Sequence, residues 1–154
     1  MLFCYMDSPV GRLLIAEESG AIVQVEFNKE PPVGAQEGDS ALLSECRRQL
    51  REYFAGERRE FALPLRAQGT PFQMACWEAL CEIPYGETRS YADIARRIGK
   101  PKACRAVGGA NHVNPISIIV PCHRVIGASG KLVGYGGGLD KKQYLLALER
   151  GEMQ

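Results

Sequence analysis

The chain has 154 residues, 45% of them hydrophobic, and a formal net charge of +1 at pH 7. This length fits one large domain or two small domains with a buried core, and no apolar run is long enough to span a membrane. The N-terminus lacks the leading positive charge of a secretory signal, so we expect a cytoplasmic protein without membrane contact, whose six cysteines are reduced thiols.

The first 65 residues are expected to form a small mixed domain of strands and one helix. Apolar residues recur at helical spacing between Ser40 and Gly56, with Ser40 as N-cap, so one helix should cover a face of the sheet. Turn sequences SPVG and EESG separate three extended runs, which predicts hairpins. These runs lie at residues 2–6, 13–16 and 21–27.

A polar stretch at residues 66–70 is interpreted as a linker to a second unit, residues 71–154. Thr70, Pro71 and Gln73 together match the start of a helix with a capping box. The apolar stripe that follows continues until the sequence PYG, where the helix should end.

Two further helices with a tight turn between them are expected next. Ser90 and Asp93 match a second capping box, Gly99 is suited to a left-handed helix terminator, and Pro101 can start the following helix, KACRAVGGANHV. Such a pair is typical of a helix-turn-helix. It also occurs in other helical domains, so the pattern alone leaves both DNA binding and an ordinary helical domain open.

The positive charge of the chain is concentrated in residues 85–124, which carry seven lysines and arginines against two acidic residues. The net charge of this segment is therefore +5, and the rest of the chain carries about −4. A basic segment favours an anionic partner, nucleic acid first, although a solvated charged face gives the same pattern.

A cysteine and a histidine follow an apolar run in VNPISIIVPCHRVIG. The run from Ile116 to Val120 predicts a short buried strand or extended segment that Pro121 ends, which would hold Cys122 at the edge of a rigid element. His123 and Arg124 would then supply a proton acceptor and positive charge to the thiol. Glycine-rich turns and a last helix, residues 141–150, complete the chain.

Two other interpretations of these cysteines were weighed. Most cysteines are inert small apolar residues, and five of the six here fit that description. A zinc site is the second alternative, but only His112 and His123 are available and no metal-ligand spacing is present. We therefore expect no metal and no other cofactor.

The sequence resembles the O6-alkylguanine-DNA alkyltransferases, also called methylated-DNA:protein-cysteine methyltransferases. The resemblance rests on PCHRV, preceded by NPISIIV and followed by GYGGGLDKK, and extends over FQMACWEALCEIPYGETRSYADIARRIG, PKACRAVGGANHVNP and LLALE. The resemblance covers residues 69–151 closely. The N-terminal sequence SPVGRLLIAEESGAIVQVEF also resembles the smaller domain of the family, but this match is much less diagnostic by itself.

The implied fold is α+β, with a small N-terminal β-sheet plus helix domain at residues 1–65 and a linker at residues 66–70. The C-terminal domain, residues 71–154, would be a mainly helical helix-turn-helix domain, winged-helix-like, carrying the active-site cysteine. Some relatives hold a structural zinc with N-terminal cysteines and histidines. Because the first 65 residues contain Cys4 and Cys46 but no histidine, we expect none here.

The implied activity is direct reversal of DNA damage. The O6-alkyl group of guanine, methyl above all, would pass to Cys122 after base flipping and so restore guanine, with lesser activity on O4-methylthymine. The thioether product has no good leaving group, so each molecule would act once. By resemblance, His123 is the base, working through water, and Glu149 orients it. Tyr91 would contact the base and assist its departure, and Asn114 would brace the active-site turn.

The implied partner is double-stranded DNA containing O6-alkylguanine, bound through its minor groove by a monomer. Arg105 would fill the gap left by the flipped base. Ala103, Ala106 and Gly108 would let the helix approach the groove closely, and Tyr135 belongs to a binding loop. Ala128 and Gly136 stand where some relatives have serine, which leaves alkyl-group preference open.

Three alternative functions were kept. An alkyltransferase-like lesion sensor would flip the base without transfer, but such relatives lack the acceptor cysteine, so Cys122 argues against this function. A helix-turn-helix transcription regulator with a buried cysteine is the second alternative. A cytosolic α/β protein of unknown role is the third.

Overall fold

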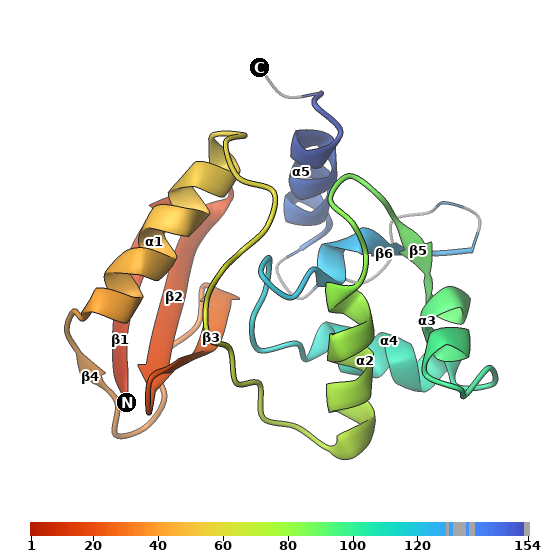
Figure 1. Ribbon diagram of the computed structural model, residues 1–154, viewed down its shortest axis with the longest axis horizontal. Helices are drawn as coiled ribbons and strands as arrows, with labels where there is room; N and C mark the ends of the chain where they lie inside the picture. The colour runs from red at the N-terminus through yellow and green to blue at the C-terminus, as the bar shows by residue number, and fades with distance from the viewer. Residues whose placement is uncertain (129, 131–134, 136–137, 153–154) are drawn as a thin grey trace.

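The computed structural model describes residues 1–128, 130, 135 and 138–152. An N-terminal sheet with one helix lies beside a mainly helical C-terminal part (Figure 1), which confirms the expected α+β class. The elements in chain order are β1 (Leu2–Ser8), β2 (Gly11–Glu18), β3 (Ala21–Phe27), β4 (Gln36–Glu37), α1 (Ala41–Phe54), α2 (Pro71–Cys81), β5 (Arg89–Ser90), α3 (Tyr91–Arg97), α4 (Cys104–His112), a 3₁₀ turn (Cys122–Arg124), β6 (Val125–Ile126) and α5 (Leu139–Glu149).

The N-terminal sheet has the strand order β3-β2-β1-β4, and α1 covers one of its faces (Figure 1). Two antiparallel hairpins join the three strands that the sequence predicts. The two-residue strand β4, parallel to β1, was not predicted because it is too short to show a periodic pattern. The Ser40 side chain accepts a hydrogen bond from Leu43 N, so the expected N-cap of α1 is confirmed.

The C-terminal part packs α2, α3 and α4 against one another. Both predicted capping boxes are present, at the starts of α2 and α3. The indole Nε1 of Trp77 on α2 donates to the carbonyl of Ala110 on α4 over 2.9 Å, which fixes these two helices together. Residues 64–66 pair with Ile22 at the edge of β3, and the domain division at residues 66–70 stays a prediction.

The turn between α3 and α4 differs from expectation at Pro101. Gly99 adopts the left-handed backbone (φ 77°) expected of a terminator. However, α4 begins at Cys104 rather than at Pro101. Residues 100–103 instead form a turn closed by a hydrogen bond from Ala103 N to Lys100 O. The φ angle of proline suits such a turn as well as a first helical turn, so the sequence signal was ambiguous.

The strand predicted from Ile116 to Val120 is wrong. Ile116 makes a single bridge to Val25 of β3, and the chain then turns through Ile118, whose φ is 73°. Val120 N donates to Ile116 O, which closes this turn. Isoleucine and valine favour extended backbone locally, but contacts made elsewhere in the chain decide this segment.

Among the residues that the structure describes, no helix is both long enough and apolar enough to cross a membrane.

The capping box of α3 supports a stability prediction. Ser90→Ala removes the acceptor for the Asp93 backbone N–H, so the free energy of unfolding should fall by about 1 kcal/mol. Urea denaturation measures this change. Ser44→Ala, at an exposed position inside α1, is the control and should be neutral or slightly stabilising. Equal losses in the two variants would contradict the capping role.

Candidate active site

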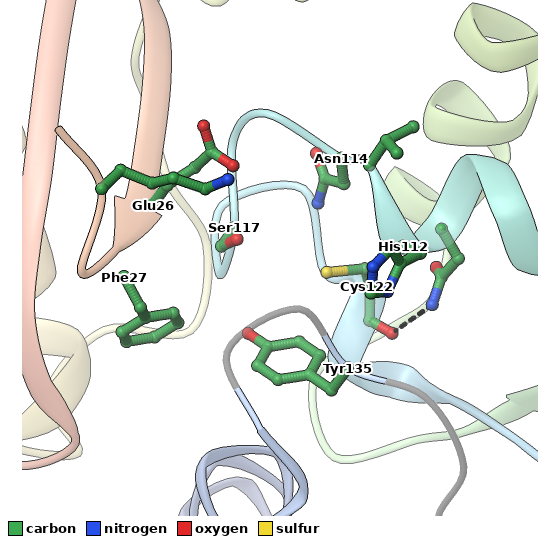
Figure 2. Close-up of a pocket in the computed structure, with 10 residues that line it drawn as sticks. Glu26, Phe27, His112, Asn114, Ser117, Cys122 and Tyr135 are labelled. Carbon is green, nitrogen blue, oxygen red and sulfur yellow. Dashed lines mark hydrogen bonds between the residues drawn. The ribbon is translucent and has the colours of Figure 1, made fainter. Parts of the chain in front are cut away.

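Cys122 opens a 3₁₀ turn and lines a cavity of about 320 Å³. The backbone bends here because Arg124 N donates to Pro121 O. Figure 2 shows the sulfur directed into the space between Asn114, Ser117 and Tyr135. The residue is only 3% exposed, yet it lies on the cavity wall rather than within packed hydrocarbon.

Both parts of the molecule form this cavity. Glu26 and Phe27, at the end of β3, and Lys29, two residues further along the chain, line one side. Residues 111–112, at the end of α4, and the adjoining Val113 and Asn114 also line the cavity. Every site residue predicted from the sequence lies in the C-terminal part. The contribution of β3 was therefore missed, because nothing in a strand pattern shows which of its ends faces a distant cysteine.

The Cys122 thiol is protonated in this environment. Burial raises its pKa to about 11, while the Asn114 amide and the Lys142 ammonium act in the opposite direction. The expectation that Arg124 supplies positive charge to the thiol is wrong, because the Arg124 guanidinium is bound to Glu149. Lys142, whose side chain is fully buried and donates to Val125 O, is the cation that acts on the sulfur.

The carboxylate of Glu149 is the centre of a buried hydrogen-bond network. His123 Nε2 lies 2.7 Å from Oε2, and Arg124 binds both oxygens, through Nε at 2.8 Å and Nη2 at 3.0 Å. Gly86 N donates to Oε1 over 3.2 Å, and the Tyr53 hydroxyl donates to Oε2 over 2.6 Å. Burial raises the pKa of Glu149, but His123 and Arg124 outweigh burial and hold the pKa well below its usual range.

This network fixes the tautomer of His123. An ionised carboxylate only accepts hydrogen bonds, so Nε2 must carry the hydrogen and Nδ1 must be the bare nitrogen. Nδ1 is buried and has no hydrogen-bond partner among the described residues. Burial lowers the pKa of His123 despite the opposing effect of Glu149, so the ring is neutral near pH 7 and can accept a proton at Nδ1.

Two asparagines hold the turn that carries Cys122. Asn114 donates to Val120 O over 2.9 Å and accepts from Ile116 N over 3.0 Å, which agrees with its predicted bracing position. Asn111, on α4, donates to Cys122 O over 3.2 Å, the dashed line in Figure 2. Asn111 was missed because an asparagine near a helix end is an ordinary feature.

The two predicted tyrosines lie near the sulfur. Burial first, and the charge of Cys122 second, raise the pKa of Tyr91, which is half-buried at the start of α3. Tyr135 is buried on the cavity wall, which it shares with Cys122 and Ser117. Ala128 is exposed, whereas Gly136 lies outside the described residues.

The residues predicted to contact DNA lie on or beside α4. Arg105 and Ala106 are exposed, and Ala103 and Gly108 are half-buried. The opposite face of this helix packs into the core through Val107, Ala110 and Asn111. Arg105 and its small neighbours therefore lie away from the core face of this helix. Cys122 shares its cavity with Asn111 and His112, at the C-terminal end of the same helix.

Sequence reasoning missed three donors to Glu149, which are Tyr53, Gly86 and Arg124. It also missed Lys142, the buried cation that acts on the sulfur. One signal was available for the lysine. Lys142, Leu145 and Glu149 follow one another at intervals of three and four residues, so they share one face of α5, and all three are buried.

The fold and site together define a class of protein in which a buried cysteine, histidine and glutamate lie behind a helix-turn-helix. Two family models match the chain. The 6-O-methylguanine DNA methyltransferase ribonuclease-like domain matches residues 1–67, and the DNA binding domain of the same name matches residues 71–151. The chain belongs to the 6-O-methylguanine DNA methyltransferase family.

Individual relatives agree with this assignment. The chain is 51% identical over 154 residues to a methylated-DNA–protein-cysteine methyltransferase of Methanosarcina acetivorans, covering 97% of this chain and 98% of the relative. It is 49% identical over 152 residues to the constitutive enzyme of Bacillus subtilis, covering 94% and 92%. The crystal structure of Mycobacterium tuberculosis OGT in complex with DNA superposes with a TM-score of 0.93 at 49% identity, covering 98% of this chain and 94% of that chain.

Because His123 is buried and neutral, we expect the free energy of unfolding to depend on pH. Because its pKa is lowered in the folded protein, the unfolded chain takes up the proton first as the pH falls. The free energy of unfolding should decline below about pH 6.5, by up to about 1.4 kcal/mol per pH unit. Protonation of Glu149 in the unfolded chain should add to the decline below about pH 4.5.

Urea denaturation at a series of pH values measures this decline. His123→Gln cannot take up the proton and should flatten the curve between about pH 6.5 and about pH 4.5. His112→Gln, at an exposed position, should keep the wild-type slope. A wild-type slope in His123→Gln would show that another group causes the decline.

Proposed function

We propose that this chain repairs alkylated DNA by direct reversal, moving the alkyl group from O6 of guanine to the sulfur of Cys122 in a single turnover. One observation carries the proposal: Cys122 lines a cavity next to a histidine whose tautomer Glu149 fixes. The names of the M. acetivorans and B. subtilis relatives describe the same transfer to a protein cysteine. The DNA complex of the M. tuberculosis relative supports DNA as the partner.

The transfer begins with a proton. The Cys122 thiol gives its proton to Nδ1 of His123 through a bridging water, and Glu149 stabilises the imidazolium that forms. The thiolate then attacks the alkyl carbon, a carbon–sulfur bond forms, and the bond between that carbon and O6 breaks with its electrons going to guanine. Tyr91 donates a hydrogen bond to the departing base. The proton taken from Cys122 passes from the His123 imidazolium through water to guanine, so the histidine and the base both end neutral.

The helix α4 is the element that we assign to DNA. Its exposed Arg105 fills the space that the flipped base leaves, and its small residues permit close approach to the minor groove. One chain contains both this helix and the complete cysteine site, so the protein acts as a monomer. Minor-groove contacts discriminate sequence poorly, which suits a protein that must find lesions in any sequence.

Intact mass spectrometry tests the acceptor. Wild-type protein mixed with an oligonucleotide containing O6-methylguanine should gain the mass of one methyl group per chain, and Cys122→Ser should gain none. Cys81→Ser, which changes an exposed cysteine outside the Cys122 cavity, is the control and should react like wild type. A methyl group found on any other residue would refute the assignment of Cys122.

The role of Arg105 predicts a difference between duplex and single-stranded substrates. Base flipping costs a few kcal/mol of stacking in a duplex and little in a single strand. Arg105→Ala should therefore slow methyl transfer about tenfold or more in duplex DNA and much less in single strands. Arg12→Ala, an exposed charge on the N-terminal sheet, controls for the lost charge. Equal losses on the two substrates would refute gap filling.

A further inference from the structure

Tyr53 connects the N-terminal part to the cysteine site. It lies on α1, is fully buried, and donates its hydroxyl hydrogen to Oε2 of Glu149 over 2.6 Å. Its ring packs against Phe54, Phe61 and Tyr85, with centroid distances of 5.4, 5.5 and 6.3 Å. The aromatic contacts fix the ring, and the ring in turn fixes the hydroxyl against the carboxylate.

The oxygen that Tyr53 contacts is the one that orients His123. Oε2 accepts from Tyr53, from His123 Nε2 and from Arg124 Nη2, whereas Oε1 accepts from Arg124 Nε and Gly86 N. Each donor withdraws negative charge from the oxygen it binds and limits the directions open to the others. The Tyr53 hydroxyl therefore affects both the orientation of His123 and the basicity that Glu149 confers on it.

Packing alone does not require this hydroxyl. A phenylalanine would fill the same aromatic cluster, and Arg124 already compensates the charge of Glu149. Burial, and then the charge of Glu149, raise the pKa of Tyr53, so the hydroxyl keeps its hydrogen and donates it at neutral pH.

We propose that Tyr53 is a positioning residue for the transfer reaction, whose hydroxyl holds the Glu149 carboxylate in the orientation that His123 needs and limits the basicity of His123. The N-terminal part thus supplies one group of the network behind the acceptor cysteine. This inference rests on the proposed role of Cys122 and His123.

The test measures single-turnover methyl transfer to Tyr53→Phe protein with DNA in excess. The rate at saturating DNA should fall about three- to tenfold, while the DNA concentration at half-saturation stays unchanged, because α1, which carries Tyr53, lies apart from α4 (Figure 1). The acid limb of the rate, followed from about pH 5 to about pH 9, should move to higher pH, because Oε2 without this donor stabilises the imidazolium more strongly.

Tyr85→Phe is the matched control. Tyr85 belongs to the same aromatic cluster, but the described residues give its hydroxyl no hydrogen bond, so this variant should keep the wild-type rate and pH profile. Leu50→Ala, on the buried face of α1, controls for destabilisation, because it should lower the melting temperature without moving the acid limb.

A second variant separates positioning from folding. 3-Fluorotyrosine incorporated at position 53 keeps the ring but makes the hydroxyl a stronger donor, so the acid limb should move to lower pH, opposite to Tyr53→Phe. If the acid limb stays at the wild-type pH in both variants, the inference is overturned. If Tyr53→Phe does not fold, the acid limb of the fluorotyrosine variant alone decides. A wild-type protein that gains no methyl group would instead overturn the proposed function.

Discussion

One buried carboxylate holds the two parts of this molecule and its cysteine site together. Glu149 has lost its hydration, so its charge needs compensation from donors that the chain itself brings to it. These donors come from α1, from the turn after α2 and from the 3₁₀ turn that begins at Cys122. Position 86 leaves little room for a side chain, since a Cβ there would lie 3.2 Å from the backbone oxygen of Glu149. The fold and the site therefore cannot be altered independently.

The state of the thiol follows from the same burial. Removing Cys122 from water favours the neutral form, so the resting sulfur is a weak nucleophile towards small electrophiles in solution. Reaction then depends on the neutral His123, which accepts a proton while Glu149 stabilises the resulting charge. In the proposed function, nucleophilicity is produced within the complex with the alkylated base rather than stored in a free thiolate.

Local signals in the sequence were sufficient for most helices and strands, because capping boxes and apolar periodicity depend on residues a few positions apart. The segment before Cys122 shows the limit of such signals. Its isoleucines and valine favour a strand, but the side-chain hydrogen bonds of Asn114 and the bridge to β3 produce a turn with Ile118 in a left-handed conformation. Family resemblance identified His123 and Glu149. It did not identify Tyr53 or Lys142, whose roles depend on contacts across the whole chain.

The distance along the chain between the two ends of this network has a consequence for biosynthesis. Tyr53 and Glu149 are separated by 96 residues, and Glu149 is the last residue of the final helix. On the ribosome, Cys122 therefore emerges before the carboxylate that completes its surroundings. Until α5 leaves the exit tunnel, the nascent polypeptide carries a cysteine without its final environment. A product released before α5 is made lacks both the completed site and the hydrogen bond between Tyr53 and Glu149 that joins the two parts.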